Sequence, residues 1–246
     1  MPDDDGYFGE SVAATYDESE ADMFRPETVD PAVGVLAELA GAGPALEFGV
    51  GTGRIALPLA ARGTPVHGIE MSRAMVARLR AKPGGAGVGV TIGDFATAQV
   101  GGTFAVAYLV FNTINNLTTQ DAQVACFRNA AAQLRPGGCF VVEVGVPDLR
   151  RLPPGQNAVP FRISPTQWAF DTYDVATQAM SSHYVTIADG RAEYWSMPFR
   201  YVWPAELDLM AQLAGLRLRD RWEDWSRAPF TGESSRHVSV WCKPAA

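Results

Sequence analysis

The sequence predicts an α/β fold: a mostly parallel sheet with helices on both faces, plus a small antiparallel β layer inserted after the fifth strand. Short apolar strands alternate with helical segments from residue 31 to about residue 145, and such alternation builds a parallel sheet through right-handed crossovers. Between about residues 160 and 203, apolar residues recur at every second position, as in antiparallel strands. The 246 residues are 47% hydrophobic, enough for one large domain or for a domain with an added lobe.

The first part of the chain supplies the alternating elements. Pro31 suits the first turn of a helix that Gly41 ends, and Ser72 and Thr118 are expected to cap two later helices. The strand that begins at Phe104 is apolar throughout, as expected when both faces of a sheet are covered. Strands are expected at 45–50, 65–71, 88–95, 104–112 and 139–146. Helices are expected at 31–40, from about 52 to 62, at 72–82, and from 118 to a stop at Pro136.

The second part of the chain adds the antiparallel layer. Three strands are expected there, and Asp189 with Gly190 indicates a hairpin between the last two. A helix then returns between Pro204 and Gly215, and two closing strands follow. The expected ranges are 167–174, 179–187 and 192–203 for the layer, and 216–225 and 237–243 for the closing strands. The expected organisation is an N-terminal segment (1–30), a core (31–150 and 204–246) and a β lobe (160–203).

A glycine-rich turn between the first strand and its helix gives the strongest indication of function. It runs from Glu47 to Arg54, with Gly49, Gly51 and Gly53 at alternate positions. Glycines there let backbone amides approach a ligand at the N-terminal end of a helix. The nicotinamide-dinucleotide pattern needs a glycine three residues after Gly51, where Arg54 stands. The turn therefore disfavours a dehydrogenase.

Acidic residues also stand where the second and third strands end. Glu70 follows Gly53 by 17 residues, a place from which a carboxylate accepts both ribose hydroxyls of an adenosine. Gly93-Asp94 ends the third strand, and Leu-Arg-Pro-Gly-Gly precedes the fifth. Together these motifs resemble those of class I S-adenosylmethionine-dependent methyltransferases, similar to the amino-sugar N-methyltransferases, over roughly residues 30–145. The resemblance implies a Rossmann-like, seven-stranded sheet with S-adenosylmethionine as cofactor and S-adenosylhomocysteine as product.

The resemblance also implies roles for single residues in binding the cofactor. Glu70 is expected on the ribose, and Met71 and Phe95 against the adenine, whose amino group Asp94 faces. Tyr16 and Arg54 are expected at the methionine carboxylate, and the backbone of Phe111 at the methionine ammonium. Purely structural alternatives stay open: packing for Tyr16, a surface acid for Glu70, an Asx turn for Asp94. The whole expected cofactor set is Tyr16, Glu47, Gly49, Gly51, Gly53, Arg54, Glu70, Met71, Gly93, Asp94, Phe95 and Phe111.

The acceptor is expected beneath the β layer, close to the loop after the fourth strand. Asn112 is a candidate catalytic residue in that loop, since an amide both donates and accepts hydrogen bonds. His237 is the candidate general base, because it begins the last strand beside the loop 222–227; an exposed strand-end histidine is the alternative. A base is needed only if the acceptor carries a proton. The candidate substrate-binding residues are Asn115, Trp168, Tyr173 and Trp225.

Charge and composition disfavour other classes of protein. The net charge of −7 disfavours a general nucleic-acid binder. Ten acidic residues fall within residues 1–30, either as a solvated leader or as an acidic cover over a site for an amine. Three cysteines without a CxxC motif predict neither a disulfide framework nor a metal site, and Cys126 and Cys139 are expected as small core residues. Neither a signal peptide nor a membrane span is expected, which leaves a cytoplasmic protein, monomeric or homodimeric.

The predicted function is transfer of a methyl group from S-adenosylmethionine to nitrogen or oxygen of a small molecule, without a metal. Proximity and in-line orientation are expected to supply most of the catalysis. The acidic N-terminal segment and the resemblance slightly favour nitrogen. Two alternatives remain: a regulatory module that binds the cofactor without turnover, and an NAD-dependent oxidoreductase.

Overall fold

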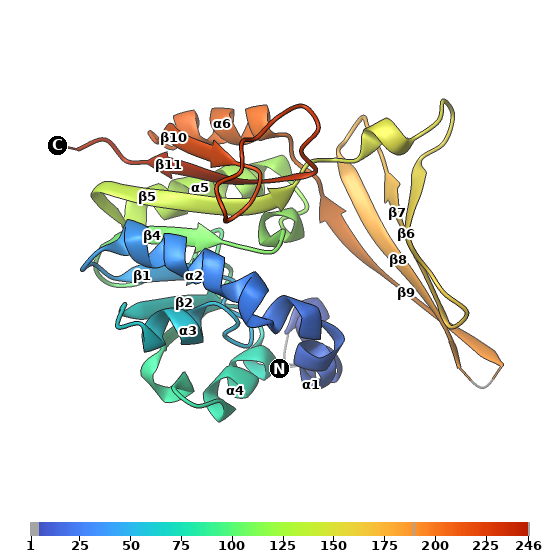
Figure 1. Cartoon of the computed structure of the whole chain (residues 1–246), viewed down its shortest axis with the longest axis horizontal. Helices are drawn as coiled ribbons and strands as arrows, with labels where there is room; N and C mark the ends of the chain where they lie inside the picture. Colours follow the sequence, from blue (N-terminus) through green and yellow to red (C-terminus); the bar gives the residue numbers. More distant parts are fainter. Residues whose placement is uncertain (1–4, 189, 246) are drawn as a thin grey trace.

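The computed structural model describes residues 5–188 and 190–245. A seven-stranded sheet forms the body of the protein, and a separate four-stranded sheet projects from it (Figure 1). The strand order in the larger sheet is β10-β11-β5-β4-β1-β2-β3, and all neighbours are parallel except β11, which runs antiparallel to β5 and β10. The predicted mostly parallel sheet is confirmed. Its strands are β1 (Ala45–Phe48), β2 (Val66–Glu70), β3 (Gly89–Ile92), β4 (Phe104–Leu109), β5 (Leu134–Gly145), β10 (Arg217–Trp222) and β11 (Arg236–Cys242).

Helices cover both faces of this sheet, and their starts differ in places from the prediction. The second helix begins at Pro26 rather than Pro31, because Pro26 itself takes the first helical position. Ser72 caps α4 as predicted, whereas α5 is capped by Thr119, whose hydroxyl accepts from the Ala122 amide, and not by Thr118. The helices are α1 (Glu10–Ser19), α2 (Pro26–Ala40), α3 (Ala56–Ala61), α4 (Arg73–Ala81), α5 (Gln120–Gln133) and α6 (Pro204–Leu213).

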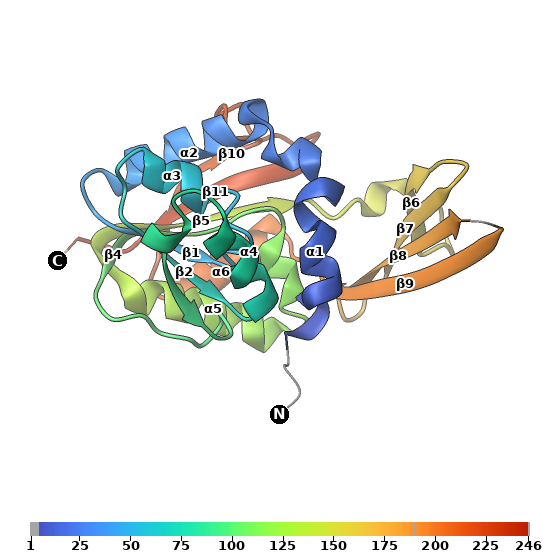
Figure 2. The same ribbon diagram turned by 90° about the horizontal axis from the view of Figure 1, so that it is seen from below.

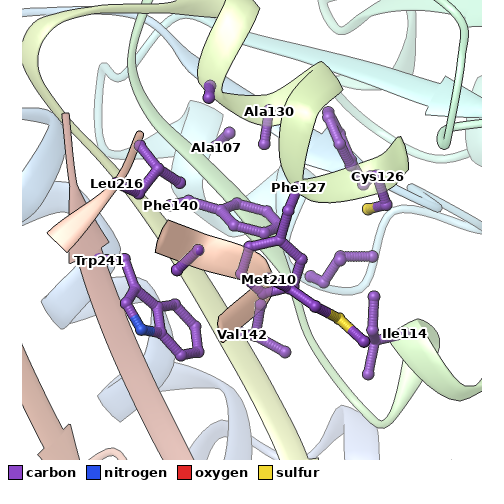
Figure 3. Packing of buried hydrophobic residues seen from close by; sticks show 14 of the residues in the cluster. Ala107, Ile114, Cys126, Phe127, Ala130, Phe140, Val142, Met210, Leu216 and Trp241 are labelled. Atoms are coloured by element: carbon purple, nitrogen blue, oxygen red, sulfur yellow. The ribbon is translucent and has the colours of Figure 1, made fainter. Parts of the chain in front are cut away.

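Two hydrophobic clusters hold the layers together, one on each face of the sheet. Helices α5 and α6 pack on one face, where Phe127 meets Phe140 and Trp241 edge to face at 5.0 and 5.4 Å between ring centroids (Figure 3). Helices α2 and α3 pack on the other face, over Tyr108 and Val141. Aromatic pairs of this kind stabilise a core beyond the area they bury. The sheet is therefore a fixed platform for the loops at its carboxyl edge.

The projecting sheet, here called the β lobe, has four antiparallel strands in the order β6-β7-β8-β9, where the sequence predicted three. The missed strand β6 contains Pro160 and pairs with β7 through a bulge, so its alternating pattern is weak. The predicted hairpin joins β8 to β9, with Ala188 opposite Arg191; Asp189 lies outside the described residues. Helix α1 lies between the body and the β lobe (Figure 2). The strands are β6 (Ala158–Ile163), β7 (Gln167–Tyr173), β8 (Ala179–Ala188) and β9 (Arg191–Arg200).

One cysteine prediction needs correction. Cys139 on β5 and Cys242 on β11 are direct cross-strand partners and form a disulfide. The pairing follows from β11 inserting beside β5, a long-range contact across 103 residues. Cys126 is unpaired and fully buried, as predicted. Among the described helices, none is both long and apolar enough to cross a membrane.

Candidate functional site

The glycine turn at the end of β1 uses a backbone conformation that favours glycine at three positions. Gly49, Gly51 and Gly53 have φ angles of 71°, 54° and 87°. A Cβ at Gly49 would lie 2.8 Å from the Thr113 side chain, and one at Gly53 would lie 2.9 Å from Leu57. A Cβ at Gly51 would meet only the Gly49 carbonyl oxygen, at 4.0 Å. Two glycines are thus required by packing, while Gly51 borders open space.

The carboxylate at the end of β2 lies beside this open space. The Gly51 amide donates to Glu70 Oε2 at 2.8 Å, and the Ser72 amide donates to Oε1 at 2.9 Å. Burial raises the pKa of Glu70, while these two amides oppose the rise. Glu70 is 8% exposed. Its neighbour Met71 is 46% exposed, and Ile92 at the end of β3 is 39% exposed. Apolar side chains left open beside a carboxylate suit a ligand with a flat ring and hydroxyl groups.

Asp94 and Phe95 follow β3 at the same edge. Asp94 Oδ1 accepts from the Ala96 amide at 2.8 Å, which is the Asx-turn geometry that the sequence left open. The Phe95 ring lies 6.1 Å from that of Phe48 and within 4 Å of a Cβ built at Gly49. The structure therefore brings Phe95 against the glycine turn.

The loop after β4 is held in an unusual conformation. Phe111 and Asn112 are consecutive non-glycine residues with φ angles of 55° and 60°. The Phe111 amide donates to Glu143 Oε2 at 3.0 Å, and Asn112 Oδ1 accepts from the Gly145 amide at 2.7 Å. The Arg54 guanidinium lies over the Phe111 ring, 5.2 Å from its centroid. Left-handed backbone held by several contacts is characteristic of functional sites.

Residues 5–25 of the N-terminal segment lie against the glycine turn. Its Asp17 accepts from the Thr52 hydroxyl at 2.6 Å and forms an ion pair with Lys82. Tyr16 packs edge to face on Phe8. Burial raises the pKa of Tyr16 to about 12; the charges of Glu20, Glu70 and Asp17 add to the rise, and that of Arg54 opposes it. The Tyr16 hydroxyl therefore lies among the side chains that surround the turn.

Glu47 lies beneath the turn rather than beside the open space. It is 2% exposed, and the Tyr108 hydroxyl donates to its Oε2 at 3.0 Å. Burial raises the pKa of Glu47 to about 8. A carboxyl group in this place stabilises the turn from within the core and does not reach the space beside Gly51.

Other predicted site residues are not brought to this edge in accessible form. His237 is fully buried in β11, with Nδ1 2.8 Å from the Ser239 hydroxyl, and its pKa is lowered to about 4, first by burial and then by Arg221. Trp225 packs in the cluster under α2. Trp168 is half exposed on the face of β7 opposite the buried Ala169.

The remaining two substrate candidates are buried. Tyr173 packs with Tyr201 and Val159 at the base of the β lobe. Asn115 is 7% exposed, and its Oδ1 has no hydrogen-bond partner in the described part of the chain. Gly93 and Asn112 lie at the carboxyl edge as expected, on the loops after β3 and β4.

Sequence reasoning expected the acceptor beneath the β lobe, but it did not predict the contact between this lobe and the N-terminal segment. The Tyr7 ring in the N-terminal segment lies 5.7 Å from the Trp195 ring on β9. Burial raises the pKa of Glu20, while Arg162 on β6 and Arg54 lower it, so Glu20 lies near both. The acidic character of residues 1–30 pointed to this region, but a strand pattern does not tell which face of the β lobe turns to the body. Among residues 5–188 and 190–245, no group of three or more His, Cys, Asp or Glu side chains is placed to hold a metal.

Comparisons with known proteins give a consistent result. A family model described as a methyltransferase domain matches residues 45–138. The CcbJ methyltransferase from Streptomyces caelestis is 38% identical in sequence, and the alignment covers 99% of this chain and 100% of that chain with a TM-score of 0.86. Cypemycin N-terminal methyltransferase from Streptomyces sp. is 25% identical over 242 residues, 94% of this chain and 98% of the relative.

A more distant structure has the same fold. The amino pentose methyltransferase CalS10 from Micromonospora echinaspora, solved with its S-adenosylmethionine bound, has a TM-score of 0.64 at 22% identity. The alignment covers 87% of this chain and 90% of that chain.

Proposed function

This chain belongs to the S-adenosylmethionine-dependent methyltransferases, and on that premise we propose that it methylates a nitrogen atom of a small amine. The observation that carries the proposal is the open space beside Gly51, whose amide donates to Glu70 and which lies next to the exposed Met71. The choice of nitrogen is supported by the similarity to the cypemycin N-terminal methyltransferase, which is named for methylation at an N-terminus. The acidic N-terminal segment over the site agrees with a basic acceptor.

The residues around the turn suit an adenosyl donor. In the proposal Glu70 holds the ribose, Met71 and Phe95 hold the adenine with Asp94, and Tyr16 and Arg54 face the methionine carboxylate. When bound, S-adenosylmethionine supplies a methyl group on a positively charged sulfur, which is electrophilic enough that no metal is required. The backbone amides of the turn and the cationic Arg54 favour the negative carboxylate by simple electrostatics.

The chain contributes chiefly by positioning. The Phe111–Asn112 backbone is fixed by Glu143 and Gly145, so the acceptor meets a rigid loop at the carboxyl edge. In the transfer step the amine lone pair forms the new N–C bond while the C–S bond breaks, and its electron pair stays on sulfur. The nitrogen must lose a proton to be neutral before it attacks. The N-terminal segment contacts the turn through Asp17 and Thr52, and in the proposal it limits the access of water to the reacting groups.

Binding of S-adenosylhomocysteine, measured by calorimetry, tests the cofactor site. We expect micromolar affinity in the intact protein and its loss in Glu70→Ala and Asp94→Ala. Glu233→Ala is the control, because that carboxylate is almost fully exposed and its ion-pair partner is Arg150, which is not a predicted site residue. No binding to the intact protein, with NAD bound instead, would overturn the proposal.

Turnover separates an enzyme from a binding module. Release of S-adenosylhomocysteine from S-adenosylmethionine is measured with a panel of small amines and the matching alcohols. Multiple turnovers with amines only support the proposal. Tight cofactor binding without turnover across the panel indicates the regulatory alternative, and turnover with alcohols only indicates O-methylation.

A further inference from the structure

One face of the β lobe turns toward the N-terminal segment and the carboxyl edge of the body. In an antiparallel sheet, direct cross-strand partners share a face. Asp171 is opposite Ser182, and Tyr184 is opposite both Ala169 and Trp195, so these side chains lie on one face. The Tyr7–Trp195 contact shows that this is the face covered by the N-terminal segment, which Figure 2 shows between the body and the lobe.

Aromatic rings form a continuous surface on this face. Tyr184 and Trp195 stack with 3.7 Å between ring centroids and 14° between their planes. Phe161 meets Tyr184 edge to face at 5.7 Å, and Tyr7 meets Trp195 at the same distance. Trp195 is 40% exposed and Phe161 45% exposed. Large aromatic surface left open beside a reaction site favours a ligand with an apolar or ring-shaped part.

Two carboxylates on different elements accompany the aromatic surface. Asp171 accepts from the Ser182 hydroxyl at 2.6 Å, and its second oxygen has only the Tyr173 hydroxyl at 3.5 Å. Asp171 shares the lobe face with Tyr184. Burial raises the pKa of Tyr184, the charges of Asp171 and Glu20 raise it further, and the Ser182 hydroxyl and the Arg162 charge oppose the rise.

Within the described part of the chain neither carboxylate forms an ion pair, although the charges of Arg162 and Arg54 lower the pKa of Glu20 and that of His183 lowers the pKa of Asp171. Among the described residues, no Lys or Arg nitrogen lies within 4.0 Å of Asp171 or Glu20. Both are partly buried, and burial raises the pKa of each. A carboxylate withdrawn from water without an ion pair is costly, and a bound cation removes that cost.

We propose that Asp171 and Glu20 bind the protonated amine of the acceptor while the stacked Tyr184–Trp195 pair holds its apolar part. The inference rests on the proposed N-methylation and adds the residues that select the acceptor. A carboxylate hydrogen-bonded to the ammonium is also the nearest acceptor for the proton that the nitrogen must lose: an N–H bond breaks and a carboxyl O–H bond forms. The selected class is a small amine with an apolar or aromatic body.

The test compares phenethylamine with phenethyl alcohol as probes, titrated by ligand-observed NMR onto the protein saturated with S-adenosylhomocysteine. The two probes differ only in the group that the carboxylates recognise. We expect the amine to bind at least tenfold more tightly than the alcohol. Asp171→Asn and, independently, Glu20→Gln are expected to weaken the amine about five- to tenfold and leave the alcohol unchanged. Trp195→Ala is expected to weaken both probes alike.

Glu193→Gln provides the matched control, because Glu193 is an exposed carboxylate on β9 that pairs with Thr186, four residues along β8 from Ser182. Its Cα lies roughly 16 Å from that of Asp171, four residues along the strands and two strands across, and the variant is expected to change neither affinity. The inference is overturned if the amine has no preference, if neither probe binds, or if Glu193→Gln weakens the amine as much as Asp171→Asn. Loss of S-adenosylhomocysteine binding by the intact protein would instead overturn the proposed function. Retained cofactor affinity in each variant shows that it is folded.

Discussion

The Thr52 hydroxyl donates a hydrogen bond of 2.6 Å to the carboxylate of Asp17, and this contact joins the glycine turn to helix α1 across 35 residues of sequence. The same carboxylate pairs with Lys82, whose ammonium also donates to the Thr52 carbonyl at 2.8 Å. Three groups from three elements thus fix one another at the turn. The N-terminal segment is therefore part of the proposed cofactor site and not merely a solvated leader.

Asp17→Asn is expected to weaken S-adenosylhomocysteine binding about fivefold. The amide removes the charge that pairs with Lys82, and a partly buried charged hydrogen bond contributes about 1 kcal/mol. Glu18→Gln is the control, since Glu18 is the exposed neighbour on the same helix. Calorimetry measures both variants. Equal affinities for the two would show that the contact does not support the cofactor site.

Tyr16→Phe tests the hydroxyl that lies among Arg54, Glu20 and Glu70. The ring keeps its packing on Phe8, so the thermal midpoint should stay within a few degrees, while affinity for S-adenosylhomocysteine falls severalfold. Tyr194→Phe is the control, because it removes a hydroxyl bonded to His183 on the lobe. Unchanged affinity in Tyr16→Phe would leave this residue with packing alone.

The three turn glycines are expected to respond differently to alanine. Gly51→Ala places a methyl group in the open space beside Glu70, so cofactor affinity should fall at least tenfold with a stability loss of about 1 kcal/mol from the positive φ. Gly53→Ala collides with Leu57 and Leu79, so its main effect should be a lower melting temperature. Gly41→Ala, at φ 55° with no neighbour within 4 Å, measures the backbone cost alone. Equal affinity in Gly41→Ala and Gly51→Ala would argue against a ligand beside Gly51.

Local features of the chain were predictable from the sequence. The glycine turn needs residues that tolerate positive φ, and the N-cap of α4 needs a short side chain that accepts a hydrogen bond, so Gly49 to Gly53 and Ser72 reveal their roles by residue type. The alternation of strands and helices likewise follows from local apolar patterns. These features predicted the body of the protein and named the residues of the proposed cofactor site.

Features that depend on long-range contacts were not predictable. Trp168 and Trp195 are both aromatic residues in antiparallel strands, and the alternation alone does not show which one faces the body. His237 stands near a strand end in the sequence, yet pairing with β5 and the Phe230 ring, 5.6 Å away, bury it completely. Cys139 and Cys242 meet only because β11 inserts beside β5. The register of the strands and their order in the sheet, rather than residue type, determine which of these side chains are buried or meet one another.

The buried carboxyl of Glu47 should make the free energy of unfolding depend on pH at values above the ordinary pKa of a glutamate. Burial raises its pKa from 4.5 to about 8, so the folded protein holds a proton that the unfolded chain releases. The stability gained from this tighter binding of the proton is complete below pH 4.5 and is lost as the pH rises to about 8. Urea unfolding between pH 5 and 9 should therefore show a steeper loss in the intact protein than in Glu47→Gln, which keeps an acceptor for the Tyr108 hydroxyl. Parallel curves would show that Glu47 ionises normally in the fold.

His237 should change the free energy of unfolding with pH in the opposite direction to Glu47, and at lower pH. Burial lowers its pKa from 6.5 to about 4, so between these values the unfolded chain binds a proton that the folded protein excludes. The free energy of unfolding should therefore fall as the pH is lowered from 6.5 to 4, by roughly 3 kcal/mol for a shift of this size.

His237→Gln should remove most of this loss and leave a remainder from His67, whose pKa burial also lowers. Urea unfolding at pH 4.5, 5.5 and 7 measures the difference between the two curves. Because His237 is fully buried in β11, the same variant is expected to keep methyl transfer and cofactor affinity at pH 7. A variant that binds S-adenosylhomocysteine normally but has lost turnover would show instead that the histidine serves as the base, and the protein would then have to open at β11 during each cycle.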